Sequence, residues 1–343
     1  MSLLDEADFR RRYDSDNALE LIARQLEQLH GEIAPPEGLV PEHIKRVVVA
    51  GMGGSALASE FARSAWSDRL PWPVDIVKAY DLPGYVNDET LVVCSSYSGS
   101  SEETLGALAA ARQAGAQVVV VTAGGKLLET ARAEGLAHLV LPAGIQGRYG
   151  VLSGVLAWAV LAETVGAAAG LVDELRQAAG AVRPPAAGWG QDAPLAGNEA
   201  KQIAERLVGH DAVIYAGPVL GAIAAKWKVD LNENAKHVAW WNVLPEMNHN
   251  ELSGWGHPQD HGCRVVELRS RLDHPQVQKR FEVMNRLMSR RWTPIEVTVP
   301  GESQVEQMVW AFMLGSFVSG YLGILNQTEI STLPLVDRLK SQL

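Results

Sequence analysis

Short β-branched runs alternate with helix-patterned stretches along most of the chain. Polar residues rarely interrupt these runs, which is typical of strands that are covered on both faces. Helices that cross over between such strands form a doubly wound, mostly parallel sheet. In the first half of the chain, the pattern predicts strands at Arg46–Ala50, Val74–Val77, Thr90–Ser95, Gln117–Thr122 and His138–Leu141.

The pattern resumes after a segment rich in Pro, Ala and Gly at residues 184–196, which we interpret as a linker. Further strands are predicted at Ala212–Ala216, Arg264–Leu268 and Ile295–Thr298. A chain of 343 residues is long enough for two domains. We therefore expect an α/β protein with two subdomains, residues 1–183 and 184–343, each a doubly wound sheet flanked by helices.

Composition argues against several classes of function. The net charge of −10 argues against a nucleic-acid partner, because phosphate backbones are bound by clustered Lys and Arg. The N-terminus lacks the pattern of a secretion signal. The apolar run at residues 151–170 contains Glu163 and is rich in Ala and Gly, so a buried helix is expected there instead of a membrane span. These features predict a cytoplasmic protein with no membrane partner.

Metal and hydrolase chemistry also lack their usual signatures. Cys94 and Cys263 stand outside any Cys/His cluster. His249 and Glu251 form H-x-E, which lacks the helical spacing of a zinc protease motif. There is no G-x-S-x-G nucleophile elbow. We expect no metal and no cofactor.

Two Gly/Ser segments each follow a predicted strand and begin a predicted helix. They are residues 50–55 (AGMGGS) and residues 95–104 (SSYSGSSEET). Glycines let an anion approach the backbone, N–H groups at a helix start attract it, and Ser hydroxyls donate to it. Each segment alone could serve only helix packing or N-terminal capping. Together, at neighbouring strand ends, they favour a phosphate site.

A dinucleotide site is the main alternative for the first segment. Gly51, Gly53 and Ala56 satisfy a loose G-x-G-x-x-A pattern, and Asp75 follows at about the distance expected of a ribose-binding carboxylate. However, Asp75 lies early in its predicted strand, and the Ser-rich segment has no role in a dinucleotide site. This interpretation ranks second.

Residues 232–255 concentrate acid–base side chains beside tryptophans, an environment in which desolvation can separate acid from base roles. Proton transfer between adjacent carbons of a sugar needs one carboxylate and a neighbour that polarises oxygen. Helix caps and loop polar residues would explain the same composition equally well. The side chains concerned are Glu233, Lys236, His237, Glu246, His249 and Glu251.

Several of these segments resemble one family of enzymes. GMGGSA, SSYSGSSEET, VTAGGKL, NENAK, NVLPEMNHNELSGW, DHPQVQKRFEV and the tail TLPLVDRLKSQL are similar to the bifunctional phosphoglucose/phosphomannose isomerases, which are built from paired sugar-isomerase (SIS) domains. The resemblance runs in order from about residue 45 to the C-terminus. Members of the family commonly have Ser-Gly-Asn-Thr where this chain has Ser98-Gly99-Ser100-Ser101, so the hydroxyl is kept.

The resemblance implies roles for individual residues. Glu233 matches the base that moves a proton through a cis-enediol(ate), and Arg148 matches the cation that steadies its charge. His249 matches a ring-opening residue that the partner subunit of a homodimer supplies, and Lys340 matches a lysine that reaches the ring oxygen. The positions that match the sugar-phosphate site are Gly53, Gly54, Ser55, Ser96, Ser98 and Ser101.

The resemblance therefore implies an isomerase that interconverts glucose-6-phosphate and/or mannose-6-phosphate with fructose-6-phosphate. A non-catalytic SIS regulator that binds sugar phosphates is the alternative from another class, although this chain has no appended basic helix-turn-helix segment. A nicotinamide-dependent oxidoreductase ranks below both.

Overall fold

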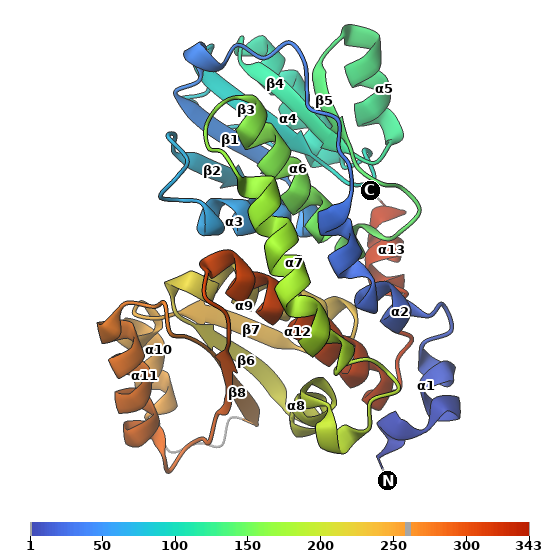
Figure 1. Ribbon diagram of the computed structural model, residues 1–343, viewed down its shortest axis with the longest axis vertical. Helices are drawn as coiled ribbons and strands as arrows, with labels where there is room; N and C mark the ends of the chain where they lie inside the picture. Colours follow the sequence, from blue (N-terminus) through green and yellow to red (C-terminus); the bar gives the residue numbers. More distant parts are fainter. Residues whose placement is uncertain (1, 258–261, 343) are drawn as a thin grey trace. The chain divides into compact units, whose positions relative to one another are not determined.

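A computed structural model describes residues 2–257 and 262–342. The chain forms two compact units, one of residues 25–179 and one that joins residues 1–24 to residues 180–343. Figure 1 shows a sheet with flanking helices in each unit. These are the first and the second unit.

The first unit, residues 25–179, contains a five-stranded parallel sheet with the order β2-β1-β3-β4-β5. This confirms the predicted parallel sheet, and each strand lies within one residue of its predicted bounds. The strands are β1 (Arg46–Gly51), β2 (Val74–Val77), β3 (Thr90–Ser95), β4 (Gln117–Thr122) and β5 (Ala137–Val140).

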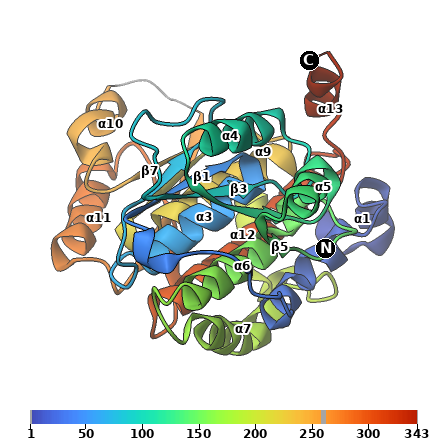
Figure 2. The ribbon, with the colours of Figure 1, turned by 90° about the horizontal axis from the view of Figure 1, so that it is seen from above.

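Helices cover both faces of this sheet. On one face, α4 (Glu102–Gln113) and α5 (Gly125–Glu134) pack on alternate strand residues such as Val92 and Val120. On the other face, α3 (Gly53–Ala65) packs against α6 (Val151–Thr164), which contains most of the predicted buried helix (Figure 2). Apolar residues at these positions bury the sheet, which is why its strands contain almost no polar residues.

The order of the strands places a crevice between β1 and β3. The chain leaves β1 through α3 towards β2 at one side, and it leaves β3 through α4 towards β4 at the other side. Ligands of open parallel sheets bind where the connections diverge in this way, at the carboxyl ends of the strands. Both Gly/Ser segments follow these two strands.

The second unit contains a four-stranded parallel sheet with the order β7-β6-β8-β9. Three of these strands match the predicted ones, whereas β7 was not predicted. The missed strand lies at the edge of the sheet, and its Trp240 and Trp241 are 51% and 41% exposed, so it lacks the buried pattern. The strands are β6 (Asp211–Ala216), β7 (Ala239–Val243), β8 (Cys263–Ser270) and β9 (Ile295–Val299).

Two layers of helices flank this second sheet. One face buries a cluster from α10 (Met247–Trp255) and α11 (Pro275–Met288). On the other face, α12 (Gln304–Leu325) packs against α8 (Glu199–Leu207) and α9 (Gly221–Glu233). The last helix, α13 (Pro334–Lys340), is solvent-exposed.

The predicted division at residues 183 and 184 needs correction at the N-terminus. The first 24 residues belong to the second unit, because α1 (Ala7–Tyr13) and α2 (Ala18–Ala23) pack on α12. Leu19 and Ile22 are buried, and the Ile330 N–H donates to the Tyr13 carbonyl at 3.0 Å. The apolar residues of α1 and α2 are thus buried against α12, a helix that is distant from them in the sequence.

The predicted linker at residues 184–196 is also wrong in part. Helix α7 (Leu171–Ala187) continues through Pro184 and Pro185, and the division between units falls inside it. The residues that follow are tied down, because the buried Lys201 ammonium donates to the carbonyls of Gln191 and Ala193 at 3.1 and 2.8 Å. A buried ammonium needs such acceptors, so this segment is ordered structure.

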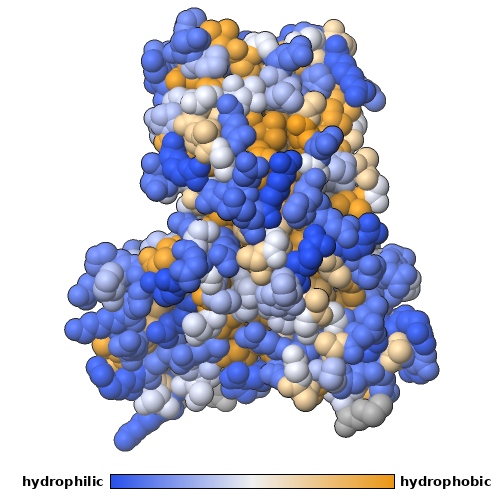
Figure 3. Space-filling view, viewed as in Figure 1, coloured by the Kyte–Doolittle hydropathy of each residue, from blue (hydrophilic) through white to orange (hydrophobic). Residues whose placement is uncertain are grey.

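Helix α12 is the one helix of the described residues that is long and apolar enough to cross a membrane. However, 94% of its most apolar window is buried inside the protein, which is typical of a core helix. Figure 3 shows a predominantly hydrophilic face, consistent with the charge of −10.

The crevice of the second sheet, between β6 and β8, is filled by a side chain. Gly217 follows β6, and a Cβ atom on it would lie 2.1 Å from Asp273 Oδ2. Asp273 is buried and accepts a hydrogen bond from the Val219 N–H at 3.1 Å. Burial raises the pKa of this carboxyl. The space in the second unit that corresponds to the crevice between β1 and β3 is therefore occupied by the chain's own carboxyl group.

We expect Gly217→Ala to lower the free energy of unfolding by about 1–3 kcal/mol, because overpacking a filled site displaces its neighbours. Gly254→Ala is the matched control, since a Cβ atom there meets nothing within 4 Å. That control should not lower the free energy of unfolding. It should raise it by up to about 1 kcal/mol, because Gly is less favourable than Ala inside a helix. Urea unfolding measures both, and equal stability of the two variants would contradict the filled crevice.

Candidate active site

The two Gly/Ser segments lie against each other at the carboxyl ends of β1 and β3. The Tyr97 N–H donates to Ser55 Oγ at 3.1 Å, which joins one segment to the other. A Cβ atom on Gly51 would lie 2.8 Å from the Ser95 carbonyl oxygen, so only glycine allows this approach. Gly99 has a φ of +69° and lies against the Gly124 carbonyl. These glycines therefore permit close approach between backbone segments.

Serine hydroxyls converge in the second segment. Ser96 Oγ lies 2.8 Å from Ser101 Oγ and 3.5 Å from Ser98 Oγ. Ser101 is the N-cap residue of α4, but its side chain makes no capping hydrogen bond. The first N–H groups of a helix have no partner within the helix and carry partial positive charge. This end of α4 thus combines three hydroxyls with a helix N-terminus, which is suited to an anion.

The turn that carries Arg148 packs against both segments. This turn is the short helix Gly147–Tyr149, and a Cβ atom on Gly54 would lie 2.9 Å from the Gly147 carbonyl oxygen. The Tyr97 ring fills the space beside Gly147 and Gly150. A void of about 10 Å³ remains between them, the size of one water molecule. The first unit therefore brings Arg148 into the same cluster as the predicted phosphate residues.

Burial favours the neutral forms of two side chains near this cluster, Tyr97 and Cys94. Burial raises the pKa of Tyr97, whose hydroxyl donates to the Pro142 carbonyl at 2.7 Å. Burial also raises the pKa of the Cys94 thiol to about 12. A thiol with this pKa is not a nucleophile near neutral pH. Arg148 brings a positive charge to the turn; it is 9% exposed and lies with its guanidinium carbon 4.8 Å from the centre of the Tyr149 ring.

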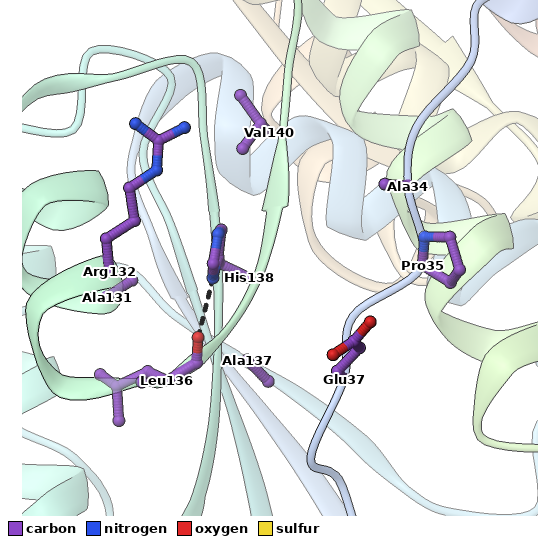
Figure 4. A pocket seen from close by; sticks show the side chains of 10 residues that line it. Ala34, Pro35, Glu37, Ala131, Arg132, Leu136, Ala137, His138 and Val140 are labelled. Atoms are coloured by element: carbon purple, nitrogen blue, oxygen red, sulfur yellow. Dashed lines mark hydrogen bonds between the residues drawn. The ribbon is translucent and has the colours of Figure 1, made fainter.

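A larger cavity of about 450 Å³ lies elsewhere in the first unit, between β5 and residues 34–37 (Figure 4). It contains none of the predicted site residues. Its His138 Nδ1 donates to the Leu136 carbonyl at 2.8 Å. The cavity reaches Gly135 and Leu136, before the start of β5, whereas the candidate cluster lies beyond the carboxyl ends of β1 and β3. Size alone therefore does not locate the candidate site.

Glu233 is the last residue of α9 in the second unit, and it is half-buried. Helix α12 holds this end of α9 in place. Asn234 Nδ2 donates to Ser319 Oγ, and Asn326 Nδ2 donates to the Ala235 carbonyl, both at 3.0 Å. Burial lowers the pKa of the nearby His237, which favours the uncharged imidazole. A carboxylate whose backbone is fixed in this way can act as a positioned base.

His249 is exposed on α10, and a hydrogen-bond network fixes this helix. The Tyr215 hydroxyl donates to Glu251 Oε2 at 2.6 Å, and Trp255 Nε1 donates to the Tyr215 hydroxyl at 2.8 Å. Asn242 Nδ2 donates to the other oxygen of Glu251. Glu251 therefore secures the helix that presents His249, and it does not belong to a metal centre in the described part of the chain.

Lys340 ends α13, where its side chain is exposed. Glu233, His249 and Lys340 thus come from three different elements of the second unit. The dinucleotide alternative also loses support. Asp75 is the second residue of β2 rather than the last, and its carboxylate accepts a hydrogen bond from the Tyr85 hydroxyl.

The residues that support the Arg148 turn were not predicted from the sequence. Gln25 and Gln28 both donate to the Tyr149 carbonyl, at 3.2 and 2.6 Å. They lie among the first forty residues, outside the segments that carry the family resemblance. The only available signal was their spacing of three, which places two side chains on one helical face.

Comparison with known proteins identifies relatives across most of the chain. The bifunctional phosphoglucose/phosphomannose isomerase of Caldicellulosiruptor bescii is 31% identical over 306 residues, which cover 88% of this chain and 90% of the relative. The enzyme of the same name from Aquifex aeolicus is 31% identical over 303 residues, covering 87% and 90%. Residues 196–343 match the family model described as "Bacterial phospho-glucose isomerase C-terminal SIS domain".

Solved structures share the fold at lower identity. The C-terminal domain of glucosamine-fructose-6-phosphate aminotransferase from Francisella tularensis superimposes with a TM-score of 0.72 at 14% identity, covering 97% of this chain and all of that one. This likeness concerns the fold alone. The identity to the two curated relatives over nine-tenths of their length, together with the matched family model, shows that the chain belongs to the bifunctional phosphoglucose/phosphomannose isomerase family and is built of SIS-type units.

Proposed function

We propose that this protein is an aldose–ketose isomerase that interconverts glucose-6-phosphate and/or mannose-6-phosphate with fructose-6-phosphate. The observation that carries the proposal is the cluster of serine hydroxyls and helix N-termini at the carboxyl ends of β1 and β3. Such a cluster suits a phosphate dianion. Membership of the isomerase family supports the choice of a phosphorylated sugar as substrate.

The phosphate would be held by the Gly/Ser segments of the first unit. Hydroxyl and N–H donors bind the phosphate oxygens without adding a fixed cation. The acidic chain therefore needs only local donors for this substrate. The residues in this role are Gly53, Gly54, Ser55, Ser96, Ser98 and Ser101.

Glu233 would move the proton. Its carboxylate takes a proton from C1 of the open-chain ketose, and the C–H electron pair forms the C1–C2 double bond as the carbonyl oxygen takes the negative charge. The resulting cis-enediol(ate) receives the same proton at C2 while the O1 hydroxyl proton passes to O2, so the aldose, with its C1 carbonyl and C2 hydroxyl, forms with no net oxidation. One carboxylate can serve as base and then as acid in such a transfer.

Three further side chains would assist. Arg148 would stabilise the enediolate oxygen, because a fixed cation acts strongly where water is excluded. His249, supplied by the partner subunit of a homodimer, would help to open the sugar ring, and Lys340 would reach the ring oxygen. The exposed positions of His249 and Lys340 are compatible with roles that need a second subunit or bound substrate.

We propose that the reaction needs no metal or other cofactor and that the protein acts in the cytoplasm. A proton transfer between adjacent carbons requires no external oxidant or reductant. Cys94 and Cys263 are both free thiols, which suits a reducing compartment.

The test is an assay of purified protein in the presence of a chelator, with fructose-6-phosphate supplied and the two aldose phosphates followed separately. We expect both glucose-6-phosphate and mannose-6-phosphate to form. Formation of one product would restrict the activity to one epimer. If neither formed while sugar phosphates still protected the protein from heat, the chain would be a non-catalytic sugar-phosphate-binding regulator.

A further inference from the structure

The amide of Gln28 makes three hydrogen bonds around the turn that carries Arg148. Gln28 lies in the short helix Gln25–His30. Its Nε2 donates to the Tyr149 carbonyl at 2.6 Å, while its Oε1 accepts from the Ser153 N–H at 2.9 Å and from Ser153 Oγ at 3.0 Å. One side chain thus bonds to the residue after Arg148 and to the first turn of α6.

This arrangement leaves the turn little freedom to move. Tyr149 and Ser153 are each 2% exposed, so a lost hydrogen bond there could not be replaced readily by water. Gln25 is 1% exposed and donates to the same Tyr149 carbonyl at 3.2 Å. The carbonyl therefore accepts from two amides, of which Gln28 makes the shorter bond.

The opposite side of the turn is closely packed. Cβ atoms on Gly147 and Gly150 would lie 3.3 and 2.7 Å from atoms of Tyr97. Tyr97 in turn donates from its backbone N–H to Ser55, in the first Gly/Ser segment. A shift of the turn would therefore change the position of Arg148 relative to the two Gly/Ser segments.

We propose that Gln28 is a positioning residue that acts through Arg148. The inference rests on the proposed role of Arg148 at the enediolate. Because Gln28 and Tyr97 hold the backbone of residues 147–149 between them, the side chain of Arg148 extends from a fixed backbone position. The Gln28 amide bonds to the Tyr149 carbonyl and to Ser153, so its effect should reach the catalytic step through the position of Arg148.

The test begins with Gln28→Glu, which keeps the shape and replaces the donor that faces the Tyr149 carbonyl with an acceptor. We expect kcat to fall about 10- to 100-fold, since small misplacements of a catalytic group have effects of this size, while KM changes by less than about threefold. Gln117→Glu is the matched control. Gln117 also bonds in both directions to one backbone residue, Val40, but it lies at the amino end of β4.

The decisive measurement compares Gln28→Glu, Arg148→Ala and the double variant. If Gln28 acts through Arg148, the double variant should have the same kcat as Arg148→Ala alone. A further tenfold loss in the double variant, or a normal kcat in Gln28→Glu while Arg148→Ala is slow, would overturn this inference and leave the proposed function intact. A normal kcat in Arg148→Ala would instead overturn the role of Arg148 and this inference with it.

Thermal unfolding of each variant separates positioning from loss of fold. Gln28→Glu and Gln117→Glu should melt within a few degrees of each other, and only the former should lose kcat. If Gln28→Glu does not fold, Gln28→Met serves in its place, because it keeps the length and removes all three hydrogen bonds. The same comparison with Arg148→Ala then applies.

Discussion

Replacing Glu233 by Gln should reduce turnover of fructose-6-phosphate by at least about 10²- to 10⁴-fold, the range that a positioned general base contributes. The amide has nearly the same shape but cannot accept the proton from carbon. Asn234 and Ala235, which follow Glu233, keep their hydrogen bonds to α12, so the end of α9 should stay in place. Substrate binding should therefore survive.

Three measurements together test this expectation: turnover, protection from heat by fructose-6-phosphate, and incorporation of solvent deuterium at carbon. The variant should lose the first and the third and keep the second. Glu246→Gln is a suitable control, because Glu246 is an exposed carboxylate in the same segment with no proposed role. Near-normal turnover in Glu233→Gln would show that another group is the base.

Replacing Ser98 and Ser101 together by Ala should weaken the use of phosphorylated sugars far more than that of free sugars. Hydrogen bonds to a charged group contribute about 1.5–3 kcal/mol each. Loss of two corresponds to about 3–6 kcal/mol, or roughly a 10²- to 10⁴-fold decrease in kcat/KM. Neither side chain caps α4, so the helix should remain stable.

The measurement compares binding and turnover of fructose-6-phosphate with those of free fructose. Ser100→Ala is the control within the same loop, since Ser100 is exposed and has no proposed contact with phosphate. The control should behave like the unmodified protein. Equal losses for phosphorylated and free sugars in the double variant would refute the phosphate assignment.

The sheet of the first unit was predictable because its strands are buried on both faces. Val47, Val48 and Val49 in β1 are each at most 1% exposed, so burial requires an unbroken apolar run. The two Gly/Ser segments could also be identified, because each follows a predicted strand and begins a predicted helix. Strand β7 was not predictable in this way, because an edge strand with exposed tryptophans carries no such pattern.

The packing of the termini was not predictable from local pattern. Helices α1 and α2 are short, and they bury Leu19 and Ile22 against α12, some three hundred residues away. Sequence periodicity shows that a helix has an apolar face, but it does not show which surface that face covers. Similarly, Pro184 and Pro185 indicated a break where the structure continues α7.

The amino-acid sequence by itself determined the parallel α/β architecture and the two Gly/Ser segments, because burial on both faces and close backbone approach each require particular residue types locally. Only the tertiary structure decided that the Arg148 turn packs on those segments, that Gln28 supports this turn, and that Asp273 fills the second crevice. Those outcomes depend on hydrogen bonds and contacts between residues distant in sequence. The shape of the folded chain sets such contacts, and local composition does not record them.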